Sequence, residues 1–142
     1  MEPDPILSND LTNTSTAISV LPANTYRLAV VRVEQARNKD DTGNVIKVQL
    51  KTLDDITAVD GQTVRAGWPL FDNIALTPTP NYPASSIEKN LKKFRLACGF
   101  AAGPFGDLLQ YEGKIVRAKV KIQKATDEYD EANRIRGYEP AA

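Results

Sequence analysis

The 142-residue sequence contains no histidine and only one cysteine, Cys98. Without imidazole, the chain cannot build histidine metal sites or use the most common general base of enzymes. The lone thiol allows no disulfide within the chain, and as a nucleophile it lacks a histidine to activate it. We therefore expect no catalytic residue, no metal and no cofactor.

The sequence also lacks a net charge and long apolar runs. Lys+Arg and Asp+Glu both number 18, so attraction for a polyanion has to come from segregated charge. No run approaches the roughly 20 apolar residues of a membrane span, and the N-terminus has no signal-peptide pattern. With one cysteine and no sign of an oxidising compartment, this predicts a soluble protein of the cytoplasm without a membrane partner.

The first 23 residues differ in composition from the rest of the chain. They are rich in Ser, Thr, Asn, Asp and Pro, and their one apolar cluster ends at Leu21. We predict a flexible N-terminal arm at 1–23 and one domain at 24–142. The arm is either a mobile tail or a segment that orders on a partner or a neighbouring subunit.

Three β-strand segments follow the arm. Residues 25–35 are strand-like, but their alternation slips at Val30 and Val31, which predicts either a β-bulge or a strongly coiled strand that serves two halves of a sheet. Residues 45–53 alternate with Lys47 and Lys51 facing outward. Residues 63–77 resume strand character, but Pro69 forbids a central ladder position, so this third strand is broken, bulged or at an edge.

One helix is expected after the third strand. Ser85 and Glu88 have the spacing of a capping box, and Gly99 is placed to stop the helix. The apolar residues at helical spacing are Ile87, Leu91, Phe94 and Cys98. This spacing predicts a helix over about 85–98 with one face against the core.

Residues 114–138 form the most unusual segment of the chain. One parity of residues 115–122 carries Arg117, Lys119 and Lys121, and the other parity is apolar. After an acidic turn at 126–131, Arg134, Arg136 and Tyr138 follow at spacing two. We predict an antiparallel hairpin with a basic face, and because like charges oppose pairing, such a face favours an anionic ligand.

Five strands with a helix between the third and fourth is the order of an oligonucleotide-binding (OB) barrel. Its first strand is long, coiled and shared by both halves, which agrees with the slip at Val30 and Val31. The predicted fold class is therefore mainly β, a five-stranded OB-like barrel with one α-helix between strands 3 and 4.

With the strands placed, residues 24–140 resemble a family of phage-encoded OB-fold proteins that bind single-stranded DNA. The resemblance rests on Thr25-Tyr26-Arg27-Leu28, Gly43-Asn44 before Val45-Ile46-Lys47-Val48, Phe71-Asp72-Asn73-Ile74, Ala97-Cys98-Gly99 and Asn133-Arg134-Ile135 with Tyr138. It implies sequence-tolerant binding in phage DNA replication or recombination, in the cytoplasm of a bacterial host. It also implies replication or recombination proteins as partners, although the acidic C-terminal tail that recruits them in many such proteins is absent.

Binding a single strand needs cations for phosphates and flat side chains for bases. The predicted binding residues are Lys47, Lys51, Trp68, Tyr82, Arg117, Lys119, Lys121, Arg134, Arg136 and Tyr138. Several have a plainer interpretation: the cations as a solvated strand face, and Trp68, like the further stacking candidate Phe71, as a core residue. Tyr82 in its proline-rich loop is the better candidate for stacking, and Tyr129 is another.

Other functions remain as alternatives at this stage. A non-enzymatic virion or assembly protein would use the arm to contact neighbouring subunits, and a homo-oligomer fits either function. The acidic turn lacks the spacing of a calcium loop, and Asp40, Asp41, Asp54 and Asp55 suit turns better than a nuclease site.

Overall fold

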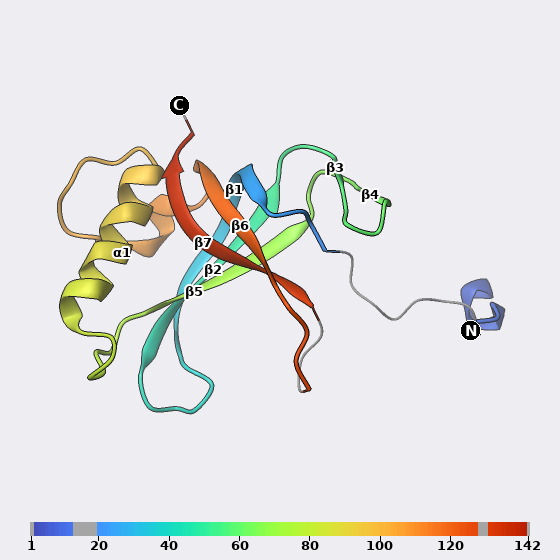
Figure 1. The fold of residues 1–142 in the computed structure, drawn as a ribbon, viewed down its shortest axis with the longest axis horizontal. Helices are drawn as coiled ribbons and strands as arrows, with labels where there is room; N and C mark the ends of the chain where they lie inside the picture. The colour runs from blue at the N-terminus through green and yellow to red at the C-terminus, as the bar shows by residue number, and fades with distance from the viewer. Residues whose placement is uncertain (1, 13–19, 128–130, 142) are drawn as a thin grey trace.

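Five runs of alternating residues form the strands of one antiparallel sheet (Figure 1). The computed structural model describes residues 2–12, 20–127 and 131–141. The sheet order is β5-β2-β1-β6-β7. These strands are β1 (Asn24–Arg37), β2 (Asn44–Thr52), β5 (Pro69–Ala75), β6 (Ile115–Gln123) and β7 (Ala132–Pro140). The predicted mainly β fold is confirmed.

Shorter elements connect the sheet strands. A small hairpin pairs β3 (Ile56–Thr57) with β4 (Thr63–Val64), which takes the first two residues of the predicted third strand. The helix α1 (Ala84–Ala97) follows β5, and the 3-10 turns are η1 (Pro5–Ser8) and η2 (Leu108–Tyr111). In the described part of the chain, no helix is long and apolar enough to cross a membrane.

The predicted slip in the first strand is confirmed as a bulge. Val30 pairs with Leu50 and Arg32 with Gln49, so Val31 has no partner residue on β2. Before the bulge, β1 pairs with β6 from Asn24 to Ala29. The extra residue increases the local twist, which lets one long strand serve both halves of the curved sheet.

Proline positions determine where the third strand begins. Pro69 is the first residue of β5, and β5 lies at one edge of the sheet, as a residue without an N–H requires. The predicted strand at 63–77 is divided in two: residues 63–64 pair with β3 in the separate hairpin, and β5 begins only at Pro69. The prediction of a broken strand at an edge is therefore confirmed.

The helix begins and ends one residue earlier than the spacing predicted. Pro83 occupies the N-cap with no side-chain capping bond, so the predicted capping box at Ser85 and Glu88 is wrong. Ser85 lies inside the first turn, where its hydroxyl cannot cap the helix. The stop is confirmed, since Gly99 has φ +93 just after the last helical residues.

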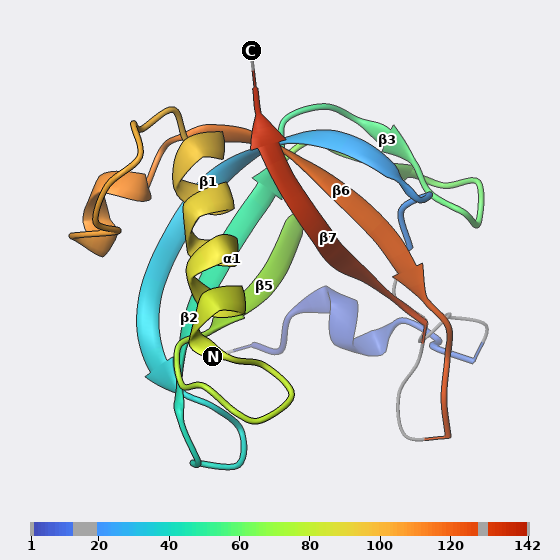
Figure 2. The ribbon, with the colours of Figure 1, turned by 60° about the vertical axis from the view of Figure 1, so that its left-hand side comes forward.

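The core lies inside the curve of the sheet and under α1. Phe94 of α1 is fully buried, and its ring packs against Phe105, Tyr111 and Tyr138. The helix packs against β7 and β5, so it covers the space between the two edge strands (Figure 2). This packing places the loop before α1 beside both edges.

The two edge strands approach each other without pairing. Among the described residues no backbone ladder joins β5 to β7, and the hydroxyl of Tyr138 donates to Asp72 across the gap at 2.7 Å. We call the gap between these two strands the seam. Because the sheet is not closed by hydrogen bonds there, the predicted barrel stays a prediction.

The last residues of the predicted arm contact the core. Leu21 is fully buried, and the side chain of Asn133 bonds both its N–H and its C=O. Farther out, Ile6, Leu7 and Leu11 are exposed. Residues 13–19 lie outside the described residues, so the flexible arm at 1–23 stays a prediction.

Candidate nucleic-acid interface

The outward residues of β1, β2 and β5 form two cross-strand rows. One row is Arg32, Gln49 and Phe71, and the next is Glu34, Lys47 and Asn73. We call these six residues the β2–β5 face. They line a hollow of about 330 Å³. The ring of Phe71 is 64% exposed, although an apolar ring of this size usually packs inside.

A second basic surface lies on β6 and its two neighbours. Arg117 pairs with Arg27 on β1, and Lys121 pairs with Arg134 on β7. With Lys119, these outward residues make up what we call the β6 face. Like charges therefore lie opposite one another twice, although only the pair of Lys121 and Arg134 belongs to the predicted hairpin and Arg117 also has Glu139 as its β7 neighbour.

A bulge in β7 changes the expected grouping of Arg134, Arg136 and Tyr138. Lys119 pairs with Gly137 but Val120 pairs with Ile135, so Arg136 is the extra residue. The bulge reverses the alternation after Arg136 and puts Tyr138 opposite buried Ala118. The expectation that all three share one face is wrong, because the period-two pattern does not continue through a bulge.

Trp68 and Phe71 differ in exposure. Trp68 is half-buried against the core, and its backbone N–H donates to the hydroxyl of Thr52. A second hollow of about 330 Å³ nevertheless brings Trp68, Phe71 and Arg134 together across the seam. Since Arg134 also pairs with Lys121, this hollow joins the β2–β5 face to the β6 face.

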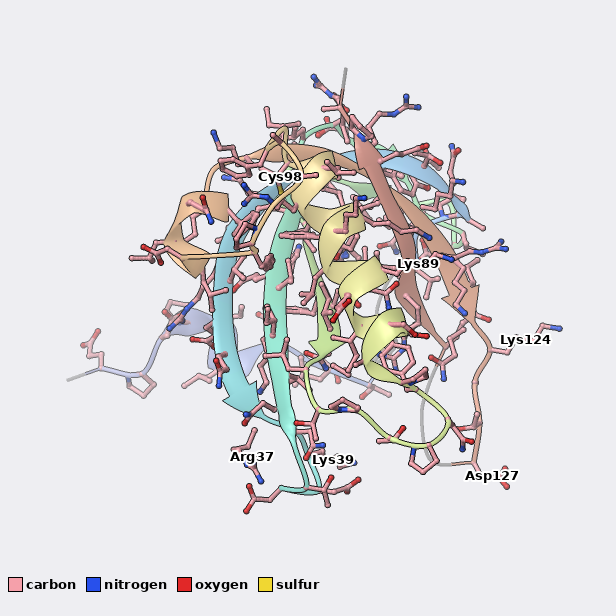
Figure 3. All side chains as sticks on the ribbon, turned by 90° about the vertical axis from the view of Figure 1, so that its left-hand side faces the viewer. Arg37, Lys39, Lys89, Cys98, Lys124 and Asp127 are labelled. Carbon is pink, nitrogen blue, oxygen red and sulfur yellow. The ribbon has the colours of Figure 1, made fainter. Side chains whose placement is uncertain are left out.

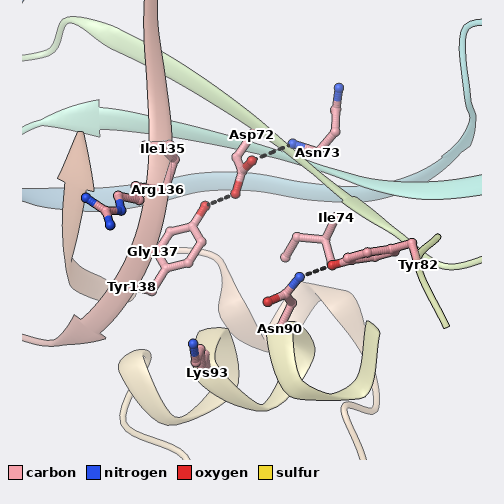
Figure 4. Close-up of a pocket in the computed structure, with 10 residues that line it drawn as sticks. All are labelled: Asp72, Asn73, Ile74, Tyr82, Asn90, Lys93, Ile135, Arg136, Gly137 and Tyr138. Atoms are coloured by element: carbon pink, nitrogen blue, oxygen red, sulfur yellow. Dashed lines mark hydrogen bonds between the residues drawn. The ribbon is translucent and has the colours of Figure 1, made fainter. Parts of the chain in front are cut away.

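Tyr82 and the remaining predicted residues gather farther along the seam. A smaller cavity of about 150 Å³, here called the seam pocket, is lined chiefly by Asp72, Tyr82, Asn90, Lys93, Arg136 and Tyr138 (Figure 4). The side chain of Asn90 donates to the hydroxyl of Tyr82. The seam pocket therefore contains three of the predicted binding residues, and sequence reasoning had missed Asn90 and Lys93.

The predicted cations have carboxylates as cross-strand neighbours at two places, Glu34 opposite Lys47 and Glu139 opposite Arg117. Ion pairs among the described residues are Arg27–Asp54, Arg32–Glu34 and Arg37–Asp41. Within the described ranges, none of the seven predicted cations is in an ion pair: Lys47, Lys51, Arg117, Lys119, Lys121, Arg134 and Arg136. Arg134 donates to Gln123, a neutral group. Unneutralised cations on adjacent strands can attract a polyanion.

Residues 8–142 match a protein-family model described as a protein of unknown function, DUF669. The chain belongs to the DUF669 family. The matched range includes all five strands of the sheet and α1, so both faces and the seam pocket lie in the family's domain. A comparison with curated proteins found no match.

The carboxylate of Asp72 is the main titratable group at the seam of this DUF669 domain. Burial raises its pKa, while hydrogen bonds from Tyr138 and the Asn73 N–H and the charge of Arg134 lower it less. The folded protein therefore holds this proton more tightly than the unfolded chain. The resulting stabilisation is complete below about pH 3.8, which is the ordinary pKa of an aspartate side chain. It is lost as pH rises through the raised pKa of Asp72 in the folded protein.

Replacing this carboxylate tests the linkage. Relative to the wild type, Asp72→Asn is expected to become progressively more stable as pH rises from about 4 to 7, because the wild type alone ionises a buried group. Urea unfolding of both proteins at several pH values measures the difference. Any altered hydrogen bonding contributes equally at every pH, so a pH-independent difference contradicts the prediction.

Cys98 lies at the end of α1 and is buried, as its place on the apolar helical face predicted (Figure 3). Burial raises the pKa of its thiol from 9.0 to about 12, with a small opposing effect of Lys114. Three pKa units lower the thiolate fraction about a thousandfold near pH 8. Alkylation by iodoacetamide is expected to be at least ~100-fold slower in the native protein than in urea, and equal rates would contradict this.

The acidic residues form no candidate metal site in the ranges that the structure describes, where no three Cys, Asp or Glu side chains cluster suitably. Asp41 and Asp54 each pair with an arginine. Residues 128–130 of the predicted acidic turn, including the stacking candidate Tyr129, lie outside the described residues.

Proposed function

We propose that this DUF669 protein binds single-stranded DNA, largely independently of sequence and without catalysis, on an OB-like barrel. The strand order supports the proposal. Counted along the chain, the five sheet strands are β1, β2, β5, β6 and β7. β1 pairs with the second and the fourth of them, β2 and β6, and α1 lies between the third and the fourth, β5 and β6. OB folds bind oligonucleotides on the face of strands 2 and 3, which correspond here to β2 and β5.

The exposed ring of Phe71 is the observation that carries the proposal. It stands on β5, with Arg32 and Lys47 on one side and Trp68 and Arg134 on the other. A base stacked on such a ring gains roughly 1–3 kcal/mol, whatever the base. Lys47 and Arg134, which are in no ion pair among the described residues, are placed to contact the phosphates of the same strand.

The β6 face supplies the electrostatic part of the proposed binding. Arg117, Lys119 and Lys121 project from alternate positions of one strand and are all exposed. Phosphates that displace counterions from these cations gain affinity at low salt. The hollow at Arg134 makes the surface continuous from Phe71 to Lys121.

The biological setting is part of the same proposal. The resemblance to phage single-stranded DNA-binding proteins favours a role in phage DNA replication or recombination, in the host cytoplasm. Replication or recombination proteins are the expected partners. Neither a cofactor nor a metal is needed for this function.

A second candidate is a virion or assembly component whose N-terminal segment contacts a neighbouring subunit. It is favoured by one observation, the exposure of Ile6, Leu7 and Leu11 around η1. Large apolar side chains that the domain leaves uncovered are suited to a partner surface. This candidate predicts that removal of residues 2–12 prevents assembly and that DNA binding is absent.

A titration of labelled oligothymidine against duplex of equal length at several salt concentrations separates the two candidates. The proposal expects submicromolar binding at low salt and a preference for single strands. It also expects a plot of log K against log salt concentration whose slope is about −0.7 for each phosphate contact. Absence of binding at low salt would overturn the proposed function.

A further inference from the structure

The seam pocket lies beside the proposed DNA surface but is a separate cavity. Tyr138 of β7 and Tyr82 before α1 flank it from opposite sides, and Asn90 and Lys93 reach it from the helix (Figure 4). Asp72 and Asn73 line both this pocket and the hollow of the β2–β5 face. A strand stacked on Phe71 therefore has an adjoining cavity within reach.

The size of the seam pocket limits what it can hold. A cavity of about 150 Å³ is known to accept a benzene molecule, that is, one six-membered ring. The seam pocket has about this volume. A pyrimidine base is a single six-membered ring, whereas a purine adds a second ring, so the volume favours the smaller base.

The lining of the pocket is polar, unlike a cavity that binds benzene. The carboxylate of Asp72 accepts one hydrogen bond at each oxygen, from Asn73 and from Tyr138, and so keeps further acceptor capacity. The amide of Asn90 uses its nitrogen for Tyr82, which leaves its oxygen as an acceptor. Lys93 supplies a donor. A ligand here needs donors and acceptors on its edge.

Other small ligands fit this arrangement less well. The carboxylate of Asp72 repels an isolated phosphate that enters deeply, and the charges of Lys93 and Arg136 repel a metal ion. A neutral, flat heterocycle with a polar edge avoids both repulsions. Its phosphate, outside the pocket, could then contact the same two cations.

We propose that the seam pocket binds one pyrimidine base of the strand held on the neighbouring face. This rests on the proposed function and adds a preference at one nucleotide to binding that is otherwise tolerant of sequence. Tyr82 and Tyr138 would flank the ring, and Asn90 and Asp72 would hydrogen-bond its edge.

Titration of the full chain with mononucleotides, followed by NMR, tests the pocket without any variant. Thymidine and deoxycytidine 5′-monophosphates are expected to shift the Asn90 side-chain amide and the Gly137 backbone amide. Deoxyadenosine 5′-monophosphate and deoxyribose 5-phosphate are expected to shift them much less. Equal shifts with the base-free phosphate would overturn the inference, because they would indicate an anion site.

A matched pair of variants tests the pocket within a strand. Oligothymidine is expected to bind about tenfold more tightly than oligodeoxyadenosine, and Asn90→Leu should reduce this ratio to about twofold. Lys89→Ala on the same helix is the control and should leave the ratio unchanged. The change in ratio is decisive because stacking within adenine runs itself produces some preference.

The two proposals can fail separately. Oligothymidine could bind with a steep salt dependence while Asn90→Leu leaves the ratio of its affinity to that of oligodeoxyadenosine unchanged. In that case the pocket inference is wrong and the proposed function stands. If no single strand binds at any salt concentration, both are wrong.

Discussion

Reversing two charges on β6, with Arg117→Glu and Lys119→Glu together, is expected to lower the affinity for oligothymidine by at least ~100-fold. Each substitution changes the local charge by two units, and a charge near a phosphate in water is worth up to about 1 kcal/mol. Four units then correspond to roughly 3–4 kcal/mol, or a factor of about 100 to 1,000. Both side chains are exposed and unpaired within the described residues, so the fold should persist.

The salt dependence gives an independent measure of the same contacts. Loss of two phosphate contacts should make the slope of log K against log salt shallower by about 1.4. The control is Lys89→Glu with Lys92→Glu, which makes the same change in net charge at two exposed residues of α1, of which Lys89 is labelled in Figure 3. A comparable loss in the control would indicate a general effect of net charge and contradict a specific β6 face.

A third charge reversal locates the path of the strand. Lys47→Glu changes one cation on the β2–β5 face, which β1 separates from β6 in the sheet order. If Lys47→Glu weakens binding but the β6 pair does not, the strand follows β2 and β5 alone. Measuring all three variants at one salt concentration therefore assigns the surface.

Much of the fold was predictable because alternation and turn chemistry act locally. The inward set of β2, Ile46, Val48 and Leu50, is buried as its parity predicted. Pro69 and Gly99 each have backbone requirements that few positions satisfy, so they correctly marked an interrupted edge strand and a helix end. The slip at Val30 and Val31 was visible because apolar residues appear at both parities.

The bulge in β7 left no such signal in the sequence. Arg134, Arg136 and Tyr138 keep a regular spacing of two, and only pairing with β6 makes Arg136 the extra residue. The inward position of Tyr138 depends on Phe94, which is more than forty residues away in sequence. Contacts of this range cannot be obtained from local periodicity.

The roles of Trp68 and Phe71 could have been separated by parity. Leu70 and Ile74 are buried on β5, so Phe71 has the opposite parity and faces outward. Trp68 has the same parity as Leu70 and contacts the core, as its plainer interpretation predicted. Their meeting with Arg134 across the seam depends on the curvature of the whole sheet and could not be predicted.

Removing the ring of Phe71 is expected to weaken oligothymidine binding by a factor of roughly 5 to 150. This range corresponds to the 1–3 kcal/mol that one base gains by stacking on an aromatic side chain. Because the ring is 64% exposed, Phe71→Ala removes little packing and should change the free energy of unfolding by less than about 1 kcal/mol. Fluorescence anisotropy at fixed salt, together with urea unfolding, measures the two quantities.

Leu109→Ala is a matched control for this prediction, since Leu109 is 67% exposed and lies in η2. It removes an equally exposed apolar side chain and should leave the affinity within about twofold. Phe71→Trp should restore or increase the affinity, because a larger ring offers more stacking area. The salt slope should be the same in all these variants, since stacking releases no counterions. If Phe71→Ala instead binds as tightly as the wild type, bases do not stack on β5, and the binding surface has to be sought on the β6 face alone.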